Sequence, residues 1–363
     1  MKTSIRISGL LFFTSLFIGA QQLMLETALD ATVNETSGLL FLNNTLITHN
    51  DSANTNQLFE IDSATGMVTR TVTVTNATNE DWEDLASDDT YIYIGDFGNF
   101  RGDRTDLKVY RIAIADYLAS TSVTADVINF SYDDQTDFTP SPLATNFDAE
   151  GLMHYNNTLY VFTKNWLDGN TNIYELPKTP GTHSISNIDS ITALGLVSGA
   201  TYNAANDSIF ITGYDLSGAF LIQLSGFNSG LFSNGTVTRT SVSLPNNYSV
   251  QIEAIAAINA NEYYITAEEN APDASGLFSL NVSTLDIVEV EQTDFRFYPN
   301  PANDKIVLSA NHCKTEIYSI SGQLLKSHTT KEIDVSDLSD GIYVLKIEDS
   351  TSQNKVTKRL IIK

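Results

Sequence analysis

Hydrophobic and polar residues alternate along most of the chain, in short runs that end at turn residues. Between residues 22 and 292 one such pattern occurs five times: a short apolar strand, a turn rich in Asn and Asp, and a strand of alternating aromatic and β-branched residues. This is the signature of a β-hairpin. The five copies are ETSGLLFLNNTLITHND from 35, DWEDLASDDTYIYIGDFGN from 81, DAEGLMHYNNTLYVFTKNW from 148, VSGATYNAANDSIFITGYD from 197 and QIEAIAAINANEYYITAEEN from 251.

Two more strands are predicted after each hairpin. The third strands are QLFEID, LKVYRI, NIYELP, AFLIQL and GLFSLN, and the fourth are MVTRTVTV, VINFSY, ITALGLV, VTRTSVSL and LDIVEVE. Four antiparallel strands in each unit, repeated at intervals of 46 to 67 residues, are typical of a β-propeller. The segment QLMLETAL at 22–29 has the pattern of a fourth strand, and we expect it to close the ring on the last blade. Five blades is the direct count, and six stays open if one blade has lost the pattern.

The N-terminal segment has the composition of a secretory signal. Lys2 and Arg6 flank its start, the run ISGLLFFTSLFIGA is apolar, and Ala20-Gln21 offers a cleavage point after a small residue. Residues 1–20 are therefore predicted to be a signal peptide, the alternative being a buried first helix. We expect no transmembrane segment in the rest of the chain. Cys313 is the single cysteine, so no intramolecular disulfide is possible and stability must come from buried area.

Charge is unevenly distributed. Residues 295–363 hold 10 Lys and Arg against 8 Asp and Glu. Subtracting these and the two bases of the signal from totals of 20 and 44 leaves 8 bases against 36 acids in the body. Such a surface repels nucleic acid and anionic lipid, and it favours cations and basic partners. Solubility in a salty environment is the simpler explanation of the same charge.

The repeats also carry a resemblance to known proteins. The run HNDSANTNQLFEIDSATG, followed by DWEDLASDDTYIYIGDFGNFRGDRTDLKVYRI, resembles secreted β-propellers of Bacteroidetes that have no assigned activity. These are distantly similar to the NHL, YWTD and gluconolactonase-like propellers. The resemblance implies the fold over residues 21–292 and says little of function, since propellers support many unrelated activities.

Residues 293–363 have a different pattern. FRFYPNPANDKIVLS, EIYSISGQLLKS, IDVSDLSDGIYVLKIED and KVTKRLIIK predict an Ig-like β-sandwich of about seven strands, with Gly322 and Gly341 at turns that need positive φ. The four blocks resemble the type A sorting domain of the type IX secretion system. The resemblance implies passage through the periplasm and across the outer membrane, contact with the secretion machinery and a sortase-like protease, and a secreted or surface-anchored product. The motif residues are Tyr298, Pro299, Asn300, Pro301, Gly322, Gly341 and Tyr343. An unrelated Ig-like appendage is the alternative.

One column of the repeat carries candidate chemistry. Ser37, Glu83, Glu150, Ser198 and Glu253 occupy equivalent positions just before the first strands, which line the channel of a propeller. Three carboxylates that converge there would repel one another unless a cation lies among them, and oxygen ligands from several segments suit Ca²⁺. One hypothesis is therefore a Ca²⁺ site formed by Glu83, Glu150, Glu253 and Asp96, with Asn50 and Asn165 able to add oxygens. The alternative is that each Glu accepts hydrogen bonds from backbone N–H groups of the next blade.

Other chemistry is scarce. The chain has no nucleophile elbow, P-loop, H-E-x-x-H or dinucleotide fingerprint, and its histidines lack metal spacing, although His49 falls near the expected mouth. We expect an extracellular or cell-surface binding module for a glycan or protein ligand, held on the loop-rich face. The alternatives are a metal-dependent hydrolase of gluconolactonase or phytase type and a structural role in the surface layer.

Overall fold

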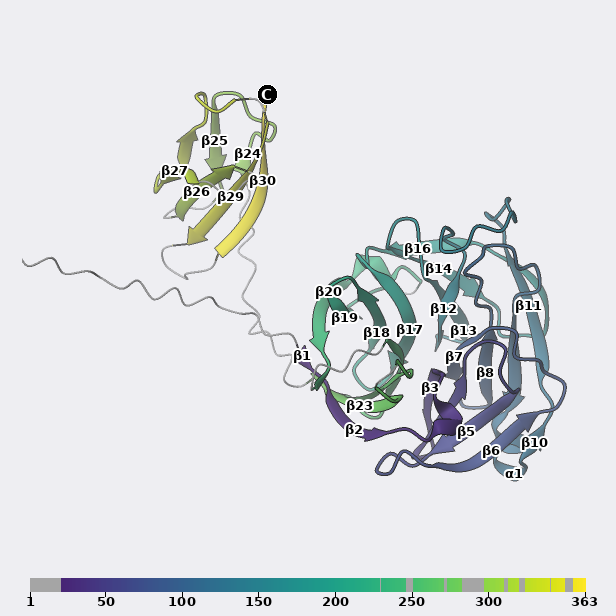
Figure 1. Ribbon diagram of the computed structural model, residues 1–363. Coiled ribbons are helices and arrows are strands. Elements are labelled where there is room, and N and C mark those ends of the chain that lie inside the picture. The colour runs from purple at the N-terminus through teal and green to yellow at the C-terminus, as the bar shows by residue number, and fades with distance from the viewer. Residues whose placement is uncertain are drawn as a thin grey trace, which may run out of the picture. The chain divides into compact units, whose positions relative to one another are not determined.

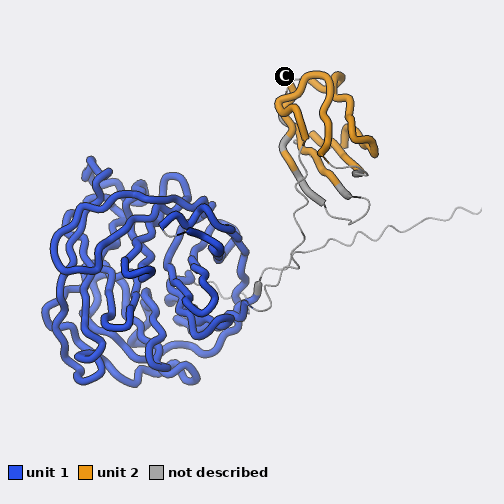
Figure 2. The backbone as a smooth tube through the Cα atoms, turned by 180° about the vertical axis from the view of Figure 1, so that it is seen from behind, with its two compact units in different colours: residues 1–284 blue, residues 285–363 orange. Residues whose placement is uncertain are grey.

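The computed structural model describes residues 21–228, 230–245, 251–270, 273–282, 297–309, 313–319, 324–339, 341–349 and 355–363. The chain divides into two compact units, residues 1–284 and 285–363 (Figures 1 and 2). The predicted signal peptide and the predicted domain boundary at 292/293 lie outside the described residues. Among the described residues, none of the helices has the length and apolar character needed to span a membrane.

Five sheets, each with four antiparallel strands, make up the first unit; four of them follow the chain from an inner to an outer strand, and the fifth takes its outer strand from the N-terminal segment. The first sheet has β3 (Thr36–Leu42), β4 (Thr45–Asn50), β5 (Gln57–Ile61) and β6 (Val68–Val74), and the second has β7 (Trp82–Ser87), β8 (Tyr91–Asp96), β9 (Lys108–Ala113) and β11 (Asp126–Tyr132). The third has β12 (Ala149–Tyr155), β13 (Thr158–Thr163), β14 (Thr171–Leu176) and β16 (Asn187–Ile191), and the fourth has β17 (Leu196–Asn203), β18 (Ser208–Asp215), β19 (Gly218–Ser225) and β20 (Thr236–Ser243). The fifth has β21 (Ile252–Ala257), β22 (Glu262–Ala267), β23 (Gly276–Asn281) and, from the N-terminal segment, β2 (Met24–Ala28).

The sheets form a closed ring of five blades. The inner strands β3, β7, β12, β17 and β21 contact one another in that order, and β21 contacts β3 again, so they surround one axis (Figure 1). Strand β2 pairs antiparallel with β23 at the outer edge of the fifth blade. The segment at 22–29 therefore closes the ring as its pattern predicts. The predicted fourth strand LDIVEVE lies outside the described residues.

Some local structure differs from the prediction. The fourth strand of the third blade is β16 and not ITALGLV, because Leu194 takes a φ of +55° and turns the chain inside that apolar run. The sequence also gave no signal for three short parallel strands, β1 (Gln21–Gln22) on β20, β10 (Ser122–Val123) on β6 and β15 (Gly181–Ile185) on β11, nor for helix α1 (Ile114–Ala119). The parallel strands cover outer edges that would otherwise be open to pairing with another chain. Two 3-10 turns, η1 (Ala31–Val33) and η2 (Phe232–Asn234), complete the elements.

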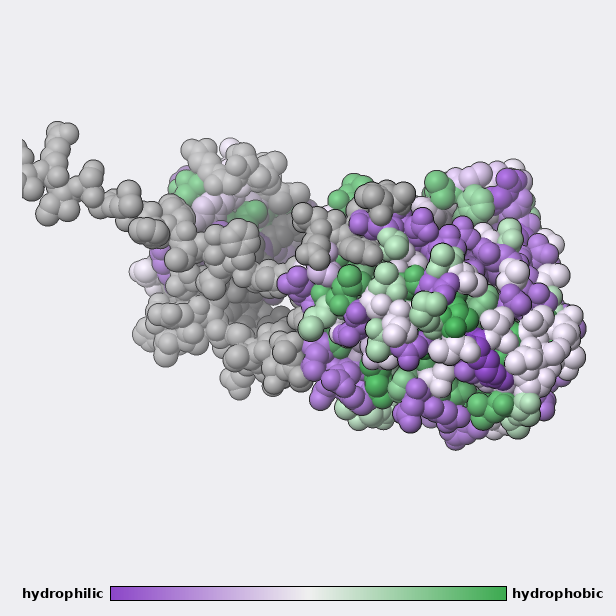
Figure 3. Space-filling model, turned by 60° about the horizontal axis from the view of Figure 1, so that its bottom comes forward, coloured by the Kyte–Doolittle hydropathy of each residue, from purple (hydrophilic) through white to green (hydrophobic). Residues whose placement is uncertain are grey.

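The core lies between the blades. Each of the five interfaces between neighbouring sheets holds its own cluster of buried apolar side chains, and a large aromatic residue marks each one: Trp82, Tyr174, Phe220, Tyr263 and Phe59. Hydrophobic residues on the face shown in Figure 3 are scattered among hydrophilic ones. The blades are therefore held together by packing that is repeated around the ring.

The second unit is a small β-sandwich. One sheet contains β24 (Phe297–Tyr298), β25 (Lys305–Leu308) and β28 (Glu332–Asp334); the other contains β27 (Leu324–His328), β26 (Cys313–Ser319), β29 (Gly341–Asp349) and β30 (Lys355–Ile362). Ile306, Ile317 and Leu345 are fully buried between the sheets. The expectation of a positive φ at Gly341 is wrong: the residue begins β29 in extended conformation, paired with Ile362. Gly322 lies outside the described residues.

Ring closure by the N-terminal segment can be tested at two neighbouring residues. Leu23 is fully buried with the apolar cluster between the fourth and fifth blades, whereas Met24 is 67% exposed. We expect Leu23→Ala to lower the free energy of unfolding by about 2–4 kcal/mol, because it removes buried methyl groups and leaves a cavity. Met24→Ala is the control and should change it by less than about 0.5 kcal/mol. Urea unfolding measures both, and equal losses would contradict closure by this segment.

Candidate functional site

The predicted column of residues lies at one end of the propeller axis. Ser37, Glu83, Glu150, Ser198 and Glu253 are all buried at or near the starts of the five inner strands. The two serines join neighbouring blades: Ser37 Oγ donates to the carbonyl oxygen of Glu83 over 2.7 Å, and Ser198 Oγ donates to that of Ile252 over 2.8 Å. Within the described residues, no backbone N–H donates to any of the three Glu carboxylates. The blades are therefore linked here by side chains such as Ser37 and Ser198 and not by the three glutamates.

The next column keeps the axis narrow. It reads Gly38, Asp84, Gly151, Gly199 and Ala254. A Cβ on Gly199 would lie 2.6 Å from the carbonyl oxygen of Glu253, and one on Gly151 would lie 3.0 Å from the Cβ of Ala200. Small residues are required because the inner strands approach so closely, and the space at the axis is left to the single larger residue of the column, Asp84.

Asp84 joins three inner strands at the axis. Its Oδ2 accepts hydrogen bonds from the backbone N–H groups of Leu152, over 2.8 Å, and Ala200, over 3.1 Å, and its Oδ1 accepts from Leu85 over 2.8 Å. Each inner strand pairs with one other strand only, so these N–H groups have no partner within a sheet. Asp84 is 1% exposed, and burial raises the pKa of its carboxyl group to about 8. The sequence analysis missed Asp84, although it is the single carboxylate in a column of Gly and Ala.

Above Asp84, six carboxylates gather at one end of the channel. We call this group the acidic mouth; its members are Asp51, Asp81, Glu83, Asp148, Glu150 and Glu253. Asp81 and Asp148 precede their inner strands, two residues before Glu83 and Glu150, and this repeated spacing was the signal by which the sequence could have revealed them. Asp51 follows β4 directly.

One half of the acidic mouth is neutralised by a buried lysine. Lys164 Nζ lies 2.9 Å from Glu150 Oε1, and both side chains are almost fully buried. Burial by itself lowers the pKa of Lys164, but Glu150, Tyr214 and Glu253 outweigh it and raise that pKa well above its ordinary value. Glu253 also accepts a hydrogen bond from Gln251 Nε2. Burial raises the pKa of Glu150 and of Glu253 well above their ordinary value, and the charge of Lys164 opposes that rise in both.

The other half has no ion pair among the described residues, although Lys164 and Arg104 act on Asp51 and Asp81 from a distance. One carboxylate oxygen each of Asp51, Asp81 and Glu83 lie within 4.8 Å of one another. Glu83 is 8% exposed, and its carboxylate has no hydrogen-bond or ion-pair partner among the described residues. Burial, followed by the neighbouring carboxylates, raises the pKa of Glu83 well above its ordinary value, and the pKa of Asp81 to about 7. A Cβ on Gly98 would collide with Glu83 Oε1 and Asp81 Oδ2, so the glycine makes room for both carboxylates.

The remaining predicted ligands are occupied elsewhere. Asp96 is fully buried and forms ion pairs with Arg104, at 3.0 Å, and Lys108, at 3.6 Å, and its Oδ1 accepts a hydrogen bond from the backbone N–H of Asp81. Asn165 accepts a hydrogen bond from Thr163 Oγ1 and donates one to Asp168. Of the predicted set, Glu83, Glu150 and Glu253 share the acidic mouth.

Two residues beside the mouth have structural contacts. Asn50 donates to the carbonyl oxygen of Thr32, whereas its amide oxygen has no partner among the described residues. His49 packs edge-on against Trp82 with ring centroids 5.5 Å apart, and burial lowers the pKa of its imidazole to about 4. His49 is therefore a neutral side chain packed between the first two blades.

Comparison with known proteins identifies the second unit. Residues 296–363 match the family described as the secretion system C-terminal sorting domain. Fold and match together define the class: a five-bladed β-propeller that carries a C-terminal sorting domain. The chain is cargo of a type IX secretion system, which exports it to the cell surface or the medium. No curated protein matches the chain in sequence.

Several solved structures are similar to the chain at low identity. PorZ, a surface component of the type IX secretion system of Porphyromonas gingivalis, is 13% identical with a TM-score of 0.36, over 90% of this chain and 45% of PorZ. The chain thus spans less than half of that protein. An exo-β-1,3-galactanase from Phanerochaete chrysosporium is 9% identical with a TM-score of 0.44, over 93% of this chain and 98% of the enzyme. At these scores the similarities add nothing on function to the sheet order and the sorting domain.

Asp84 can be tested by truncation. We expect Asp84→Ala to lower the free energy of unfolding by about 3 kcal/mol, because three buried N–H groups lose their acceptor. Asp116→Ala removes an exposed carboxylate and should cost less than about 0.5 kcal/mol. Urea unfolding followed by circular dichroism measures both. A loss of the same size in the two variants would show that Asp84 does not hold the inner strands.

The buried acids also predict how stability depends on pH. The pKa values of about 7 for Asp81 and about 8 for Asp84 exceed those of the unfolded chain, so the folded protein binds more protons between about pH 4 and 8. Their stabilising contribution is full below pH 4 and is lost as pH rises through 7 to 8. In chelator we expect a lower melting temperature at pH 8.5 than at pH 5.5. A rise across that window would contradict the burial of these groups.

Proposed function

We propose that this exported protein is an extracellular binding module whose propeller holds a Ca²⁺ ion at the acidic mouth. The observation that carries the proposal is the group of Asp51, Asp81 and Glu83, whose carboxylate oxygens lie within 4.8 Å of one another while Glu83 has no partner among the described residues. Burying such a group of charges is unfavourable unless the carboxyl groups take up protons or a cation accompanies them.

The chemistry of the group suits a hard divalent cation. Ca²⁺ takes six to eight oxygen ligands in flexible geometry, often from separate chain segments. The loop after β4 supplies Asp51, and the segment entering β7 supplies Asp81 and Glu83. Positions that these three do not fill would be open to water or to oxygens of an extracellular partner. The net charge of −24 also attracts cations and basic ligands to this protein.

A hydrolase is the second candidate, because a Ca²⁺ ion held by Asp51, Asp81 and Glu83 could polarise a substrate oxygen or activate a bound water. The two candidates differ in turnover: the module binds Ca²⁺ and a partner without consuming either, whereas the hydrolase cleaves a lactone or a phosphate ester in a Ca²⁺-dependent reaction. Turnover by the wild type that is lost in Glu83→Gln would favour the hydrolase.

Calcium binding is tested with two variants that make the same chemical change. Glu83→Gln removes the unpaired buried carboxylate, whereas Glu80→Gln removes an exposed carboxylate three residues away. We expect isothermal titration calorimetry to find one Ca²⁺ site per wild-type chain, an affinity at least about tenfold lower for Glu83→Gln, and no change for Glu80→Gln. Ca²⁺ should also raise the melting temperature of the wild type.

Two outcomes would count against the site. Melts that superimpose in Ca²⁺ and in chelator, with no bound metal by elemental analysis, would leave the acidic mouth as a structural feature. Equal losses in Glu80→Gln and Glu83→Gln would show that Ca²⁺ is attracted by overall charge rather than by this site.

A further inference from the structure

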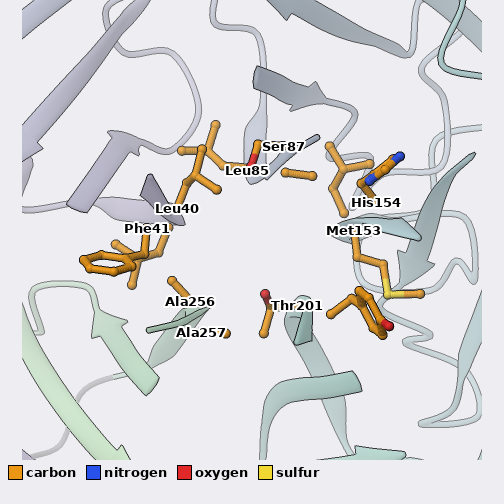
Figure 4. Close-up of a pocket in the computed structure, with 13 residues that line it drawn as sticks. Leu40, Phe41, Leu85, Ser87, Met153, His154, Thr201, Ala256 and Ala257 are labelled. Atoms are coloured by element: carbon orange, nitrogen blue, oxygen red, sulfur yellow. The ribbon is translucent and has the colours of Figure 1, made fainter. Parts of the chain in front are cut away.

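The opposite end of the channel contains a second hollow. From the acidic mouth the inner strands run to their hairpin turns, where all five surround a cavity of about 130 Å³ (Figure 4). Beside it lies a wider bowl of about 760 Å³ between the turns of the first four blades. Ser87, His154 and Tyr202 line both, so cavity and bowl are neighbours. We call them together the turn-side pocket. Its bowl has the size of a typical small-ligand site.

Main-chain groups face this cavity. Asp84 accepts from the N–H groups of Leu85, Leu152 and Ala200, which shows that these residues direct their main-chain polar groups to the axis. The direction of the main-chain N–H and C=O groups alternates along a strand with a period of two. Ser87, His154 and Tyr202 are therefore the next residues whose main-chain groups point to the axis. The inner strands have no second neighbouring strand. Each of these three residues therefore presents both an N–H and a C=O to the cavity, beyond the reach of the single Asp84 carboxylate.

The charged side chains of the bowl are one ion pair, Asp88 with Lys178, and the exposed carboxylate of Asp89. The carboxylate of Asp88 lies 2.6 Å from Lys178 Nζ and accepts a hydrogen bond from Tyr93. Although partial burial opposes it, Lys178 and three further donors lower the pKa of Asp88 to about 2, so this pair keeps both charges. Burial lowers the pKa of His154, which keeps its imidazole neutral at pH 7. At the acidic mouth, by contrast, the six carboxylates outnumber the one buried lysine.

Aromatic and amide groups complete the lining. Tyr155 and Tyr202 meet edge to face with ring centroids 4.7 Å apart, and the turn residues Asn156 and Asn157 stand beside them. The imidazole Nε2 of His154 is buried and has no hydrogen-bond partner among the described residues. The pocket thus combines aromatic surface with many donors and acceptors, one ion pair that is already satisfied and the exposed carboxylate of Asp89.

The combination of main-chain N–H and C=O groups in the cavity favours a ligand group that can both donate and accept hydrogen bonds. A carboxylate in the cavity would face carbonyl oxygens, and an ammonium group would face N–H groups, so either would meet like partial charges. A hydroxyl group donates and accepts at once and can satisfy both. We propose that the turn-side pocket binds the terminal residue of a neutral saccharide, with its hydroxyls hydrogen-bonded to the main chain of Ser87, His154 and Tyr202 and its ring in contact with the tyrosines. The site is independent of the Ca²⁺ site, which lies beyond Asp84 at the other end of the channel.

Calorimetric titration of the full exported chain tests the proposal. The probes are four neutral sugars: cellotriose, maltotriose, mannotriose and diacetylchitobiose. At least one is expected to bind with a Kd below about 1 mM. Ser87→Leu fills the cavity and should weaken that binding at least about tenfold. Ser217→Leu makes the same change at an exposed position at the other end of the fourth blade and should leave it unchanged.

Two crossed measurements separate this site from the acidic mouth. Glu83→Gln should retain sugar binding, and Ser87→Leu should retain Ca²⁺ binding, so failure of one proposal does not imply failure of the other. Amide hydrogen exchange on the wild type locates the sugar without any variant: exchange should slow at Ser87, His154 and Tyr202. Slowing confined to residues 81–84 would overturn the assignment. So would the absence of binding by all four sugars, or binding of an extended peptide in their place.

Discussion

The carboxyl group of Asp84 holds the centre of this protein. A propeller leaves one edge of every inner strand without a neighbouring strand, and those edges converge where there is little room for water. In this chain the Oδ atoms of one side chain accept from N–H groups of the second, third and fourth blades. The Gly and Ala residues of the same column allow the strands to come close enough for one carboxyl group to reach three of them. The narrow axis and the buried acid thus depend on each other.

Because Asp84 fills the axis, the channel has two separate ends. The acidic mouth collects six carboxylates against one buried lysine, and the arrangement of charge divides it further, into a paired half around Lys164 and an unpaired half around Glu83. At the turn side the lining has one ion pair and one exposed carboxylate, that of Asp89, and is rich in main-chain donors and acceptors. The same five strands therefore offer a cation site at one end and a site for hydroxyl groups at the other.

Much of the fold follows from local pattern. The alternation within each repeat predicted the strands of the blades, and the segment at 22–29 was recognisable as the strand that closes the ring. Errors arose where a single residue or a long-range contact overrode the pattern. Leu194 takes a positive φ inside an apolar run that otherwise reads as one strand, and the parallel edge strands β10 and β15 form through contacts with chain segments about 50 residues away.

The blade repeat, the sorting domain and the position of Glu83, Glu150 and Glu253 at one end of an axis could be predicted from the sequence, because they depend on periodicity and on short motifs. The partners of those acids could be found only in the folded structure. Asp96 is paired with Arg104 and Lys108, Glu150 is paired with Lys164, and Glu83 lies with Asp51 and Asp81. Charge pairing depends on distances of a few ångströms between segments far apart in the chain, and a repeat aligned residue by residue carries no information about such distances.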